Sequence, residues 1–348
     1  MADHNFDVVI LGGGSGGYAA ALRSAQLGKS VALIEKDKLG GTCLHRGCIP
    51  TKALLHSAEV ADVVKESAHY GVESAFGSIN MPVVNKYRDG IVDRLYKGLS
   101  GLVSSKAITL VSGEGRLVGP KTVQVNGDTY TGTNVVLASG SYSRSLPGLE
   151  IGGRVITSEH ALQLDFVPGK VIVLGGGVIG VEFASIWKSF GADVTIVEGL
   201  NHLVPNEDEA VSKGLERAFR KRGIDFKLGV RFSGVEQHAN GVVVSLENGE
   251  KLISASVAGV LYDKHPFIKP AELAAELLSD TPPEPKQQNE AMERGTLTAD
   301  EMDALRLQQV MLRMIGGRAR IDLAHLMRVE QHQAPPQALA HEDAQVLR

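Results

Sequence analysis

Two copies of one glycine pattern constrain this fold more than any other feature. Gly-x-Gly-x-x-Gly follows the apolar run 6–11, and the same spacing recurs after the apolar run 171–174. Each apolar run is typical of a parallel strand that is buried on both faces. Such glycines allow a tight turn and a close approach to a pyrophosphate at the N-terminus of the next helix. The repeat therefore predicts an α/β fold with two Rossmann-like units of the three-layer ββα type. The fingerprint glycines are Gly12, Gly14, Gly17, Gly175, Gly177 and Gly180.

An acidic residue ends the second strand of each predicted unit. Strand 30–34 leads to Glu35, and strand 194–197 leads to Glu198. A carboxylate roughly 20 residues past the glycines is placed to bind ribose hydroxyls. In the second unit such a charge repels a 2′-phosphate, so Glu198 predicts NAD rather than NADP. The alternative is a pair of glycine turns that only pack a helix on a sheet.

The only two cysteines of the chain, Cys43 and Cys48, are separated by four residues. A disulfide that closes so small a loop stabilises a fold poorly, which favours a chemical role over a structural one. Residues 49–55 are expected to form a helix with Pro50 in its first turn. Cys48 then lies at a positive helix end, which lowers the pKa of a thiol, while Cys43 is expected on the preceding loop. The pattern predicts a redox-active pair.

Two alternatives compete with a redox role for the cysteines. One is an inert structural disulfide. The second is a zinc site formed by Cys43, His45, Cys48 and His56, but these spacings are not those of zinc fingers. We expect no metal site.

The segment 40–52, Gly-Gly-Thr-Cys-x4-Cys-Ile-Pro-Thr-Lys, resembles the redox centre of the flavin-dependent pyridine nucleotide–disulfide oxidoreductases. Its Cys-Leu-His-Arg-Gly-Cys wording is most similar to that of dihydrolipoyl dehydrogenases. Ala138-Ser139-Gly140 resembles the Ala-Thr-Gly segment that closes the first nucleotide unit of this family. Residues 203–208 resemble its Leu-Pro-Asn-Glu-Asp segment, although Glu207 and Asp208 are equally well explained as a charged helix start. The resemblance covers residues 5–255.

The resemblance implies that FAD binds to the first unit and NAD to the second. It implies that electrons pass from dihydrolipoamide through Cys43 and Cys48 and FAD to NAD, with Cys43 exchanging with substrate and Cys48 facing the flavin. Lys52 and Glu182 match positions that form an ion pair beside the flavin, where a lysine stabilises charge on the reduced ring. The alternative for both is a solvated helix residue. The residues implied in cofactor binding, besides the fingerprint glycines, are Glu35, Gly41, Thr42, Lys52, Ser139, Gly140 and Glu198.

Other functions remain open at this point. Glutathione and mercuric reductases share the cysteine spacing, although they usually prefer NADP, which Glu198 opposes. A different class is a non-catalytic nucleotide-binding protein, truncated or fused. By resemblance, the expected partner is the lipoyl domain of a 2-oxoacid dehydrogenase complex. A homodimer is expected in the family and is in doubt for this chain.

Composition excludes several classes of function. A net charge of −4 without a basic stripe argues against nucleic-acid binding. No apolar run approaches the ~18 residues of a membrane span. The first residues show no secretory signal, and a cytoplasmic setting suits a dithiol that must cycle.

We expect three segments: an FAD-binding domain with the cysteine pair (1–147), an NAD-binding domain (148–255) and a mostly helical, unrecognised tail (256–348). Within the first two, helices are expected at 53–69 and 83–106, and hairpin turns at Asn126-Gly127 and Asn248-Gly249.

The tail shows none of three features that family members carry after residue 255: a further strand of the NAD domain, an Ala-x-Gly-Asp segment and a catalytic His-x4-Glu pair. His325 and Glu330 have that spacing, but on a helix they point about 140° apart, so no catalytic role is expected. At most a slow diaphorase activity with NADH is then expected.

Overall fold

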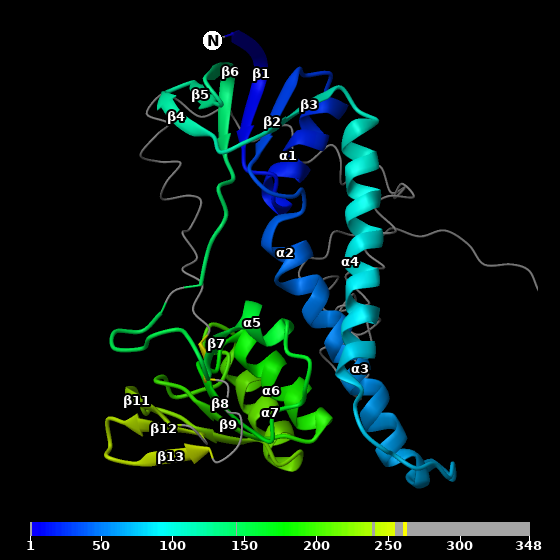
Figure 1. Ribbon diagram of the computed structural model, residues 1–348, viewed down its shortest axis with the longest axis vertical. Helices are drawn as coiled ribbons and strands as arrows, with labels where there is room; N and C mark the ends of the chain where they lie inside the picture. Colours follow the sequence, from blue (N-terminus) through cyan, green and yellow to red (C-terminus); the bar gives the residue numbers. More distant parts are fainter. Residues whose placement is uncertain (1, 144, 239–240, 255–259, 263–348) are drawn as a thin grey trace, which may run out of the picture. The chain divides into compact units, whose positions relative to one another are not determined.

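The computed structural model describes residues 2–143, 145–238, 241–254 and 260–262 (Figure 1). All of them belong to one compact unit, Met1–Pro283. The expectations for residues 263–348, among them those for His325 and Glu330, lie outside the described residues.

The first nucleotide unit is built on a six-stranded sheet with the strand order β3-β2-β1-β6-β5-β4. The first four strands in this order are parallel, and the last two continue from β6 as an antiparallel meander. The turn between β5 and β6 is the predicted Asn-Gly hairpin, with φ of 51° at Asn126 and 91° at Gly127. The strands are β1 (Asp3–Leu11), β2 (Val31–Glu35), β3 (Ile108–Ser112), β4 (Arg116–Gly119), β5 (Thr122–Val125) and β6 (Asp128–Leu137).

This sheet has a different cover on each face. On one face, Ile10 and Leu33 pack with residues of helices α1 (Ser15–Gln26) and α4 (Met81–Ser104). On the other face, Val9 and Ile34 pack against Val123, Val125 and Tyr130 of the antiparallel meander. The alternation follows from the period of a strand, in which neighbouring side chains point to opposite faces.

The second nucleotide unit repeats this plan. A parallel sheet with the order β10-β9-β8-β14-β7 carries a separate antiparallel sheet, β11-β12-β13. The antiparallel sheet covers one face through Val242 and Val244, which pack on Ile172 and Leu174. Helix α6 (Val178–Phe190) covers the opposite face (Figure 1). The expected three-layer α/β fold is confirmed. The strands are β7 (Val155–Thr157), β8 (Lys170–Leu174), β9 (Asp193–Val197), β10 (Asp225–Lys227), β11 (Phe232–His238), β12 (Gly241–Leu246), β13 (Lys251–Ser254) and β14 (Val260–Tyr262).

Strand β14 corrects one expectation. The sequence predicts no further strand of the second unit after residue 255, yet β14 pairs in parallel with β7 and β8 in the middle of the second sheet. Its segment Val260–Tyr262 is too short for an apolar pattern to stand out from the sequence around it.

Two long helices, which come between β2 and β3 in the chain, lie side by side. The expected helix 53–69 begins earlier, as α3 (Cys48–Glu66), and a 3-10 turn, Ser67–Tyr70, follows it. Asn80 caps α4 by accepting a hydrogen bond from the Val83 N–H at 3.2 Å. In Figure 1, α3 and the cyan α4 run alongside each other, and α3 also contacts α6. The remaining helices are α2 (Gly41–His45), α5 (Ser158–Leu162) and α7 (Glu209–Lys221).

The helix that carries Cys48 is thus fixed to both units. Leu54 and Ala58 of α3 share a buried cluster with Phe183 and Trp187 of α6. In the described part of the chain, no helix is long and apolar enough to span a membrane.

Candidate functional site

The first glycine turn is shaped by contacts that leave no room for side chains. Gly12 has a φ of 109°, and a Cβ there would overlap the Ala138 carbonyl. A Cβ on Gly17 would overlap the carbonyl oxygen of Gly12, so the turn packs directly on α1. At Gly14 the space is open, because the nearest atom to an added Cβ is Cα of Gly41 at 3.9 Å.

The second turn has the same construction. Gly175 also has a φ of 109°, and a Cβ on Gly180 would overlap its carbonyl oxygen. Gly177 is the N-cap residue of α6 as Gly14 is the N-cap residue of α1. The dipole and the backbone N–H groups at a helix N-terminus favour binding of a phosphate. Both turns therefore fit the pyrophosphate of a dinucleotide.

The two predicted carboxylates hold these turns in matching ways. Glu35 accepts a hydrogen bond from the Gly13 N–H at 2.6 Å and, with its other oxygen, from the Asp37 N–H at 2.8 Å. The buried Glu198 accepts from the Gly176 N–H at 2.7 Å and the Leu200 N–H at 2.8 Å. Each carboxylate binds the N–H of the residue between the first two glycines of its fingerprint, where the ribose of a dinucleotide is expected.

The remaining residues predicted for the first cofactor also lie around the first turn. The Gly40 N–H donates to the Gly13 carbonyl at 2.9 Å, and a Cβ on Gly41 would lie 2.7 Å from Cα of Gly14. Thr42 follows on an exposed position. Ser139 and Gly140, both exposed, come directly after β6 and follow Ala138, whose carbonyl lies over Gly12.

The predicted redox pair lies in two consecutive helices. Cys48 is the first residue of α3, as predicted, but Cys43 lies in the short helix α2 and not on a loop. The prediction failed there because five residues are too few to show a helical period. Both cysteines are free thiols and half-buried.

The pKa values of the two thiols are shifted in opposite directions. The hydrogen bond from Cys43 is the largest influence on Cys48; against the cost of burial, and helped by the Lys52 ammonium, it lowers the pKa of Cys48 to about 6. The same hydrogen bond and burial raise the pKa of Cys43 well above its ordinary range. One proton therefore stays on Cys43 while Cys48 carries the negative charge.

The expected ion pair between Lys52 and Glu182 is confirmed. The Lys52 ammonium donates to the Glu182 carboxylate, and both side chains are more than four-fifths buried, at 17% and 18% exposed. Lys52 is one helical turn beyond Cys48, and Glu182 is in the first turns of α6. The pair therefore links the cysteine helix to the helix that follows the second glycine turn.

The histidines of the zinc alternative are engaged elsewhere. His45 Nε2 is 2.8 Å from the Leu39 carbonyl oxygen, and His56 Nδ1 is 3.2 Å from Glu59. Among the residues that the structure describes, no group of three His, Cys, Asp or Glu side chains could hold a metal ion.

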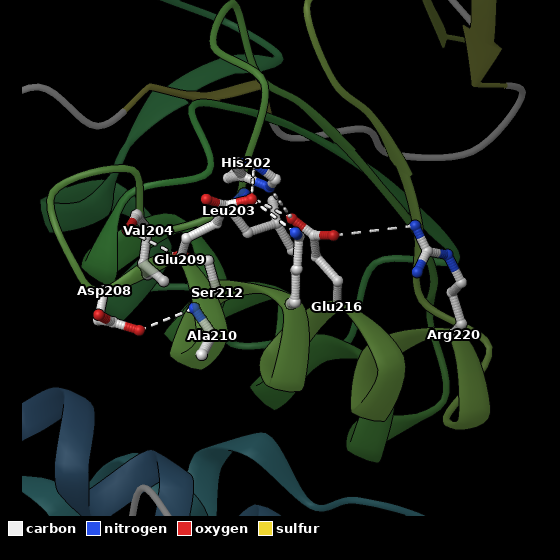
Figure 2. Close-up of polar contacts among 10 residues, drawn as sticks. His202, Leu203, Val204, Asp208, Glu209, Ala210, Ser212, Glu216 and Arg220 are labelled. Atoms are coloured by element: carbon white, nitrogen blue, oxygen red, sulfur yellow. Dashed lines mark hydrogen bonds and ion pairs between the residues drawn. The ribbon is translucent and has the colours of Figure 1, made fainter.

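One buried acidic residue near the second turn was missed. Glu216 of α7 is 5% exposed and contacts the segment that follows β9 (Figure 2). The sequence feature that could have revealed Glu216 is its position on the buried face of an amphipathic helix, between Ser212 and Phe219, where a carboxylate is unusual. Of the acidic residues before α7, Asp208 caps this helix by accepting a hydrogen bond from the Ala210 N–H at 2.8 Å, as expected for a charged helix start.

Two matching glycine turns are present, and one helix, α3, carries both Cys48 and the lysine of a buried ion pair. These features are typical of one class of protein. The family model described as pyridine nucleotide-disulphide oxidoreductase matches residues 6–262, so the chain belongs to this family. The match confirms the resemblance and extends it beyond residue 255.

Named relatives agree with the family. The chain is 45% identical to dihydrolipoyl dehydrogenase from Bacillus subtilis over 240 residues, which cover 65% of this chain and 51% of the relative. It is 39% identical to leghemoglobin reductase from Glycine max over 280 residues, covering 76% and 53%.

Solved structures share the fold. The HOCl-induced flavoprotein disulfide reductase RclA from Escherichia coli superposes with a TM-score of 0.65 at 26% identity, over 81% of this chain and 61% of that one. LpdA from Mycobacterium tuberculosis superposes with a TM-score of 0.68 at 24% identity, over 82% and 63%. The chain spans about half the length of the curated relatives it matches.

Proposed function

We propose that this chain is the nucleotide-binding and redox part of an FAD-dependent disulfide oxidoreductase of dihydrolipoyl dehydrogenase type. It uses the Cys43–Cys48 pair to take electrons from dihydrolipoamide and deliver them to NAD. The observation that carries the proposal is the thiol pair itself, with the pKa of Cys48 lowered to about 6 by Cys43 and Lys52. A low-pKa thiol next to a high-pKa one is the asymmetry that directed disulfide exchange needs.

The asymmetry assigns a role to each cysteine. A substrate thiolate that attacks the Cys43–Cys48 disulfide at Cys43 Sγ breaks the S–S bond and releases Cys48 as a thiolate. A thiol of lower pKa leaves faster, so attack at Cys43 is favoured over attack at Cys48. The second substrate thiol then displaces Cys43, which closes the substrate disulfide and leaves the pair reduced by two electrons.

The glycine turns are suited to the cofactors. In the proposal, residues 1–147 bind FAD through Gly12, Gly14, Gly17 and Glu35, with Gly41, Thr42, Lys52, Ser139 and Gly140 around the same turn. When bound, FAD supplies a two-electron acceptor beside the dithiol, and NAD a hydride acceptor. Lys52 places a positive charge next to Cys48 and stabilises its thiolate.

The second unit is proposed to bind NAD. Because β14 belongs to its sheet, this unit extends beyond residue 255, which was its expected limit from the sequence. Gly175, Gly177 and Gly180 shape the turn, and Glu198 presents its carboxylate where a 2′-phosphate would otherwise lie. Glu182, on the same helix, balances Lys52. The charge of Glu198 also argues against the NADP preference of glutathione and mercuric reductases.

The proposed substrate is a dithiol presented by the lipoyl domain of a 2-oxoacid dehydrogenase complex. The proposed compartment is the cytoplasm, where reducing conditions allow a dithiol to cycle rather than stay oxidised. A homodimer is the proposed assembly of the whole enzyme.

Trapping the mixed disulfide tests this function. Oxidised chain is mixed with dihydrolipoamide, quenched with an alkylating reagent and mapped by mass spectrometry. The lipoamide adduct is expected on Cys43. An adduct on Cys48 would reverse the assignment, and no adduct on either cysteine would reject the function.

A further inference from the structure

Glu216 is a buried carboxylate, and one of its oxygens contacts two consecutive residues of the loop 199–208. In Figure 2, its Oε1 accepts a hydrogen bond from the Leu203 N–H at 3.2 Å and lies 3.2 Å from Nδ1 of His202. Its other oxygen is 3.9 Å from the exposed Arg220. Burial of a carboxylate is unfavourable unless its contacts compensate for the lost hydration. The position of Glu216 therefore suggests that its carboxylate stabilises the conformation of the loop 199–208.

This loop rests on the second glycine turn. The Val204 N–H donates to the Gly176 carbonyl at 2.7 Å. A Cβ on Gly176 would lie 2.6 Å from Cδ2 of Leu203, so that side chain closes directly over the turn. Gly176 is the residue whose N–H is bound by Glu198. Glu216 is thus linked to Glu198 by three hydrogen bonds, which are joined through the backbone of Leu203–Val204 and of Gly176.

The first glycine turn has the same contact, made by a different residue. There the Gly40 N–H donates to the Gly13 carbonyl at 2.9 Å, and Leu39 lies over Gly13 as Leu203 lies over Gly176. Gly40 has a φ of 105°, and Val204, in the matching place, has a φ of 45°.

Glycine adopts a positive φ without strain, whereas valine does not. Val204 is β-branched and also precedes Pro205, which disfavours this conformation further. A residue in such a conformation persists only where its surroundings hold it. The second unit therefore needs a support that the first unit, with Gly40, can do without.

We propose that Glu216 is a positioning residue of the second nucleotide site. Its carboxylate holds the Leu203 N–H and so keeps Val204 in the conformation whose N–H binds the Gly176 carbonyl. The glycine turn and Glu198 then stay in place for the dinucleotide. This inference rests on the proposed binding of NAD to the second unit.

Four variants of the full chain separate support of the loop from general stability. Glu216→Leu replaces the acceptor with an apolar side chain, and Glu216→Gln keeps a carbonyl acceptor of nearly the same shape without the charge. Glu209→Gln is the matched control, because it removes an exposed carboxylate 3.7 Å from the same His202 without touching the loop backbone. Val204→Gly removes the need for the support.

Two measurements are made on each variant: amide hydrogen exchange of Leu203 and Val204, and NADH affinity by calorimetry. We expect Glu216→Leu to speed exchange and weaken NADH binding roughly tenfold or more, as loss of a buried charged acceptor implies. For Glu216→Gln, both the exchange rate and the NADH affinity are expected to lie between those of Glu216→Leu and the unmutated chain. Glu209→Gln is expected to change neither the exchange rate nor the NADH affinity. Retained FAD binding by the first unit checks that each variant is folded.

The decisive variant is Glu216→Leu combined with Val204→Gly. Val204 is buried, so its loss lowers the thermal midpoint further through lost packing. NADH affinity is nevertheless expected to return to within a few-fold of the unmutated chain, because glycine needs no support at a positive φ. Affinity and stability then move in opposite directions, which a purely structural role of Glu216 does not allow.

The outcomes distinguish the two proposals. An unmutated chain that binds no NADH rejects the proposed function and this inference with it. NADH binding that is normal in the unmutated chain and unchanged in Glu216→Leu overturns this inference alone. If Glu216→Leu does not fold, Glu216→Gln decides: exchange at Leu203 and Val204 no faster than in the unmutated chain overturns the inference.

Discussion

Lys52, which lies on α3 one helical turn beyond Cys48, donates a hydrogen bond to Glu182 of α6. The two charges act on Cys48 with opposite signs: the pKa of this thiol is lowered by Lys52 and raised by Glu182. The ion pair therefore connects the second nucleotide unit electrostatically to the dithiol of the first.

Substitutions at the two partners are expected to shift the pKa of Cys48 in opposite directions. Lys52→Met should raise it by about one unit, because the thiolate loses a nearby positive charge, and Glu182→Gln should lower it slightly. The rate of alkylation across a pH series in the Cys43→Ser background measures the pKa. Lys65→Met, at the far end of the same helix, is the control. Shifts of the same sign in both variants would contradict the role of the ion pair.

The hydrogen bond between the two thiols makes a second prediction. Since the Cys43 thiol is the largest cause of the low pKa of Cys48, Cys43→Ala should move that pKa from about 6 towards the ordinary thiol value. Alkylation of Cys48, which requires the thiolate, then begins at higher pH. Cys43→Ser keeps a donor and should shift it less. The assignment of roles is wrong if Cys48 in Cys43→Ser titrates no lower than Cys43 in Cys48→Ser.

Alanine substitutions in α1 test the packing of the first glycine turn. In Gly17→Ala the new methyl overlaps the Gly12 carbonyl, and the turn must move, at a cost on the order of 3 kcal/mol of unfolding free energy. FAD retention and the thermal midpoint should both fall. Gly16→Ala is the matched control, because a Cβ at Gly16 meets nothing within 4 Å. Equal losses in the two variants would refute the packing argument.

The preference of the second unit for NADH is expected to depend on Glu198. Its carboxylate also holds the N–H groups of Gly176 and Leu200, so Glu198→Arg should weaken both nucleotides. The readout is therefore the ratio of NADPH to NADH affinity, which should change tenfold or more in favour of NADPH. Calorimetric titrations with both nucleotides measure it, and Glu35→Arg should leave the ratio unchanged. Equal affinities for the two nucleotides in the unmutated chain would rule out this role of Glu198.

The sequence was most informative where spacing and chemistry coincide. The glycines, Glu35 and Glu198 were predictable because each fingerprint requires a fixed turn between a strand and a helix, and the structure has both. Lys52 and Glu182 are 130 positions apart in the chain, so their contact came from the family resemblance and not from any local pattern.

Other features depend on tertiary contacts. The helical position of Cys43 follows from a single turn that packs against its neighbours, and β14 is a strand because two neighbouring strands pair with it. The strain at Val204 is equally invisible in the sequence, where a valine before a proline predicts an extended backbone. Its positive φ accompanies the hydrogen bond from its N–H to the Gly176 carbonyl, and the role proposed for Glu216 depends on that contact.

Counting thiols after reduction by NADH tests the central claim most directly. The chain is first oxidised so that Cys43 and Cys48, its only cysteines, form a disulfide, and is then given FAD and NADH without any other electron acceptor. NADH and one proton are expected to convert the disulfide to two thiols per chain, with NAD released, and omission of FAD should abolish the conversion. A thiol count that stays at zero while both FAD and NADH are bound would contradict the proposal that this chain exchanges electrons between the cysteine pair and a nicotinamide nucleotide.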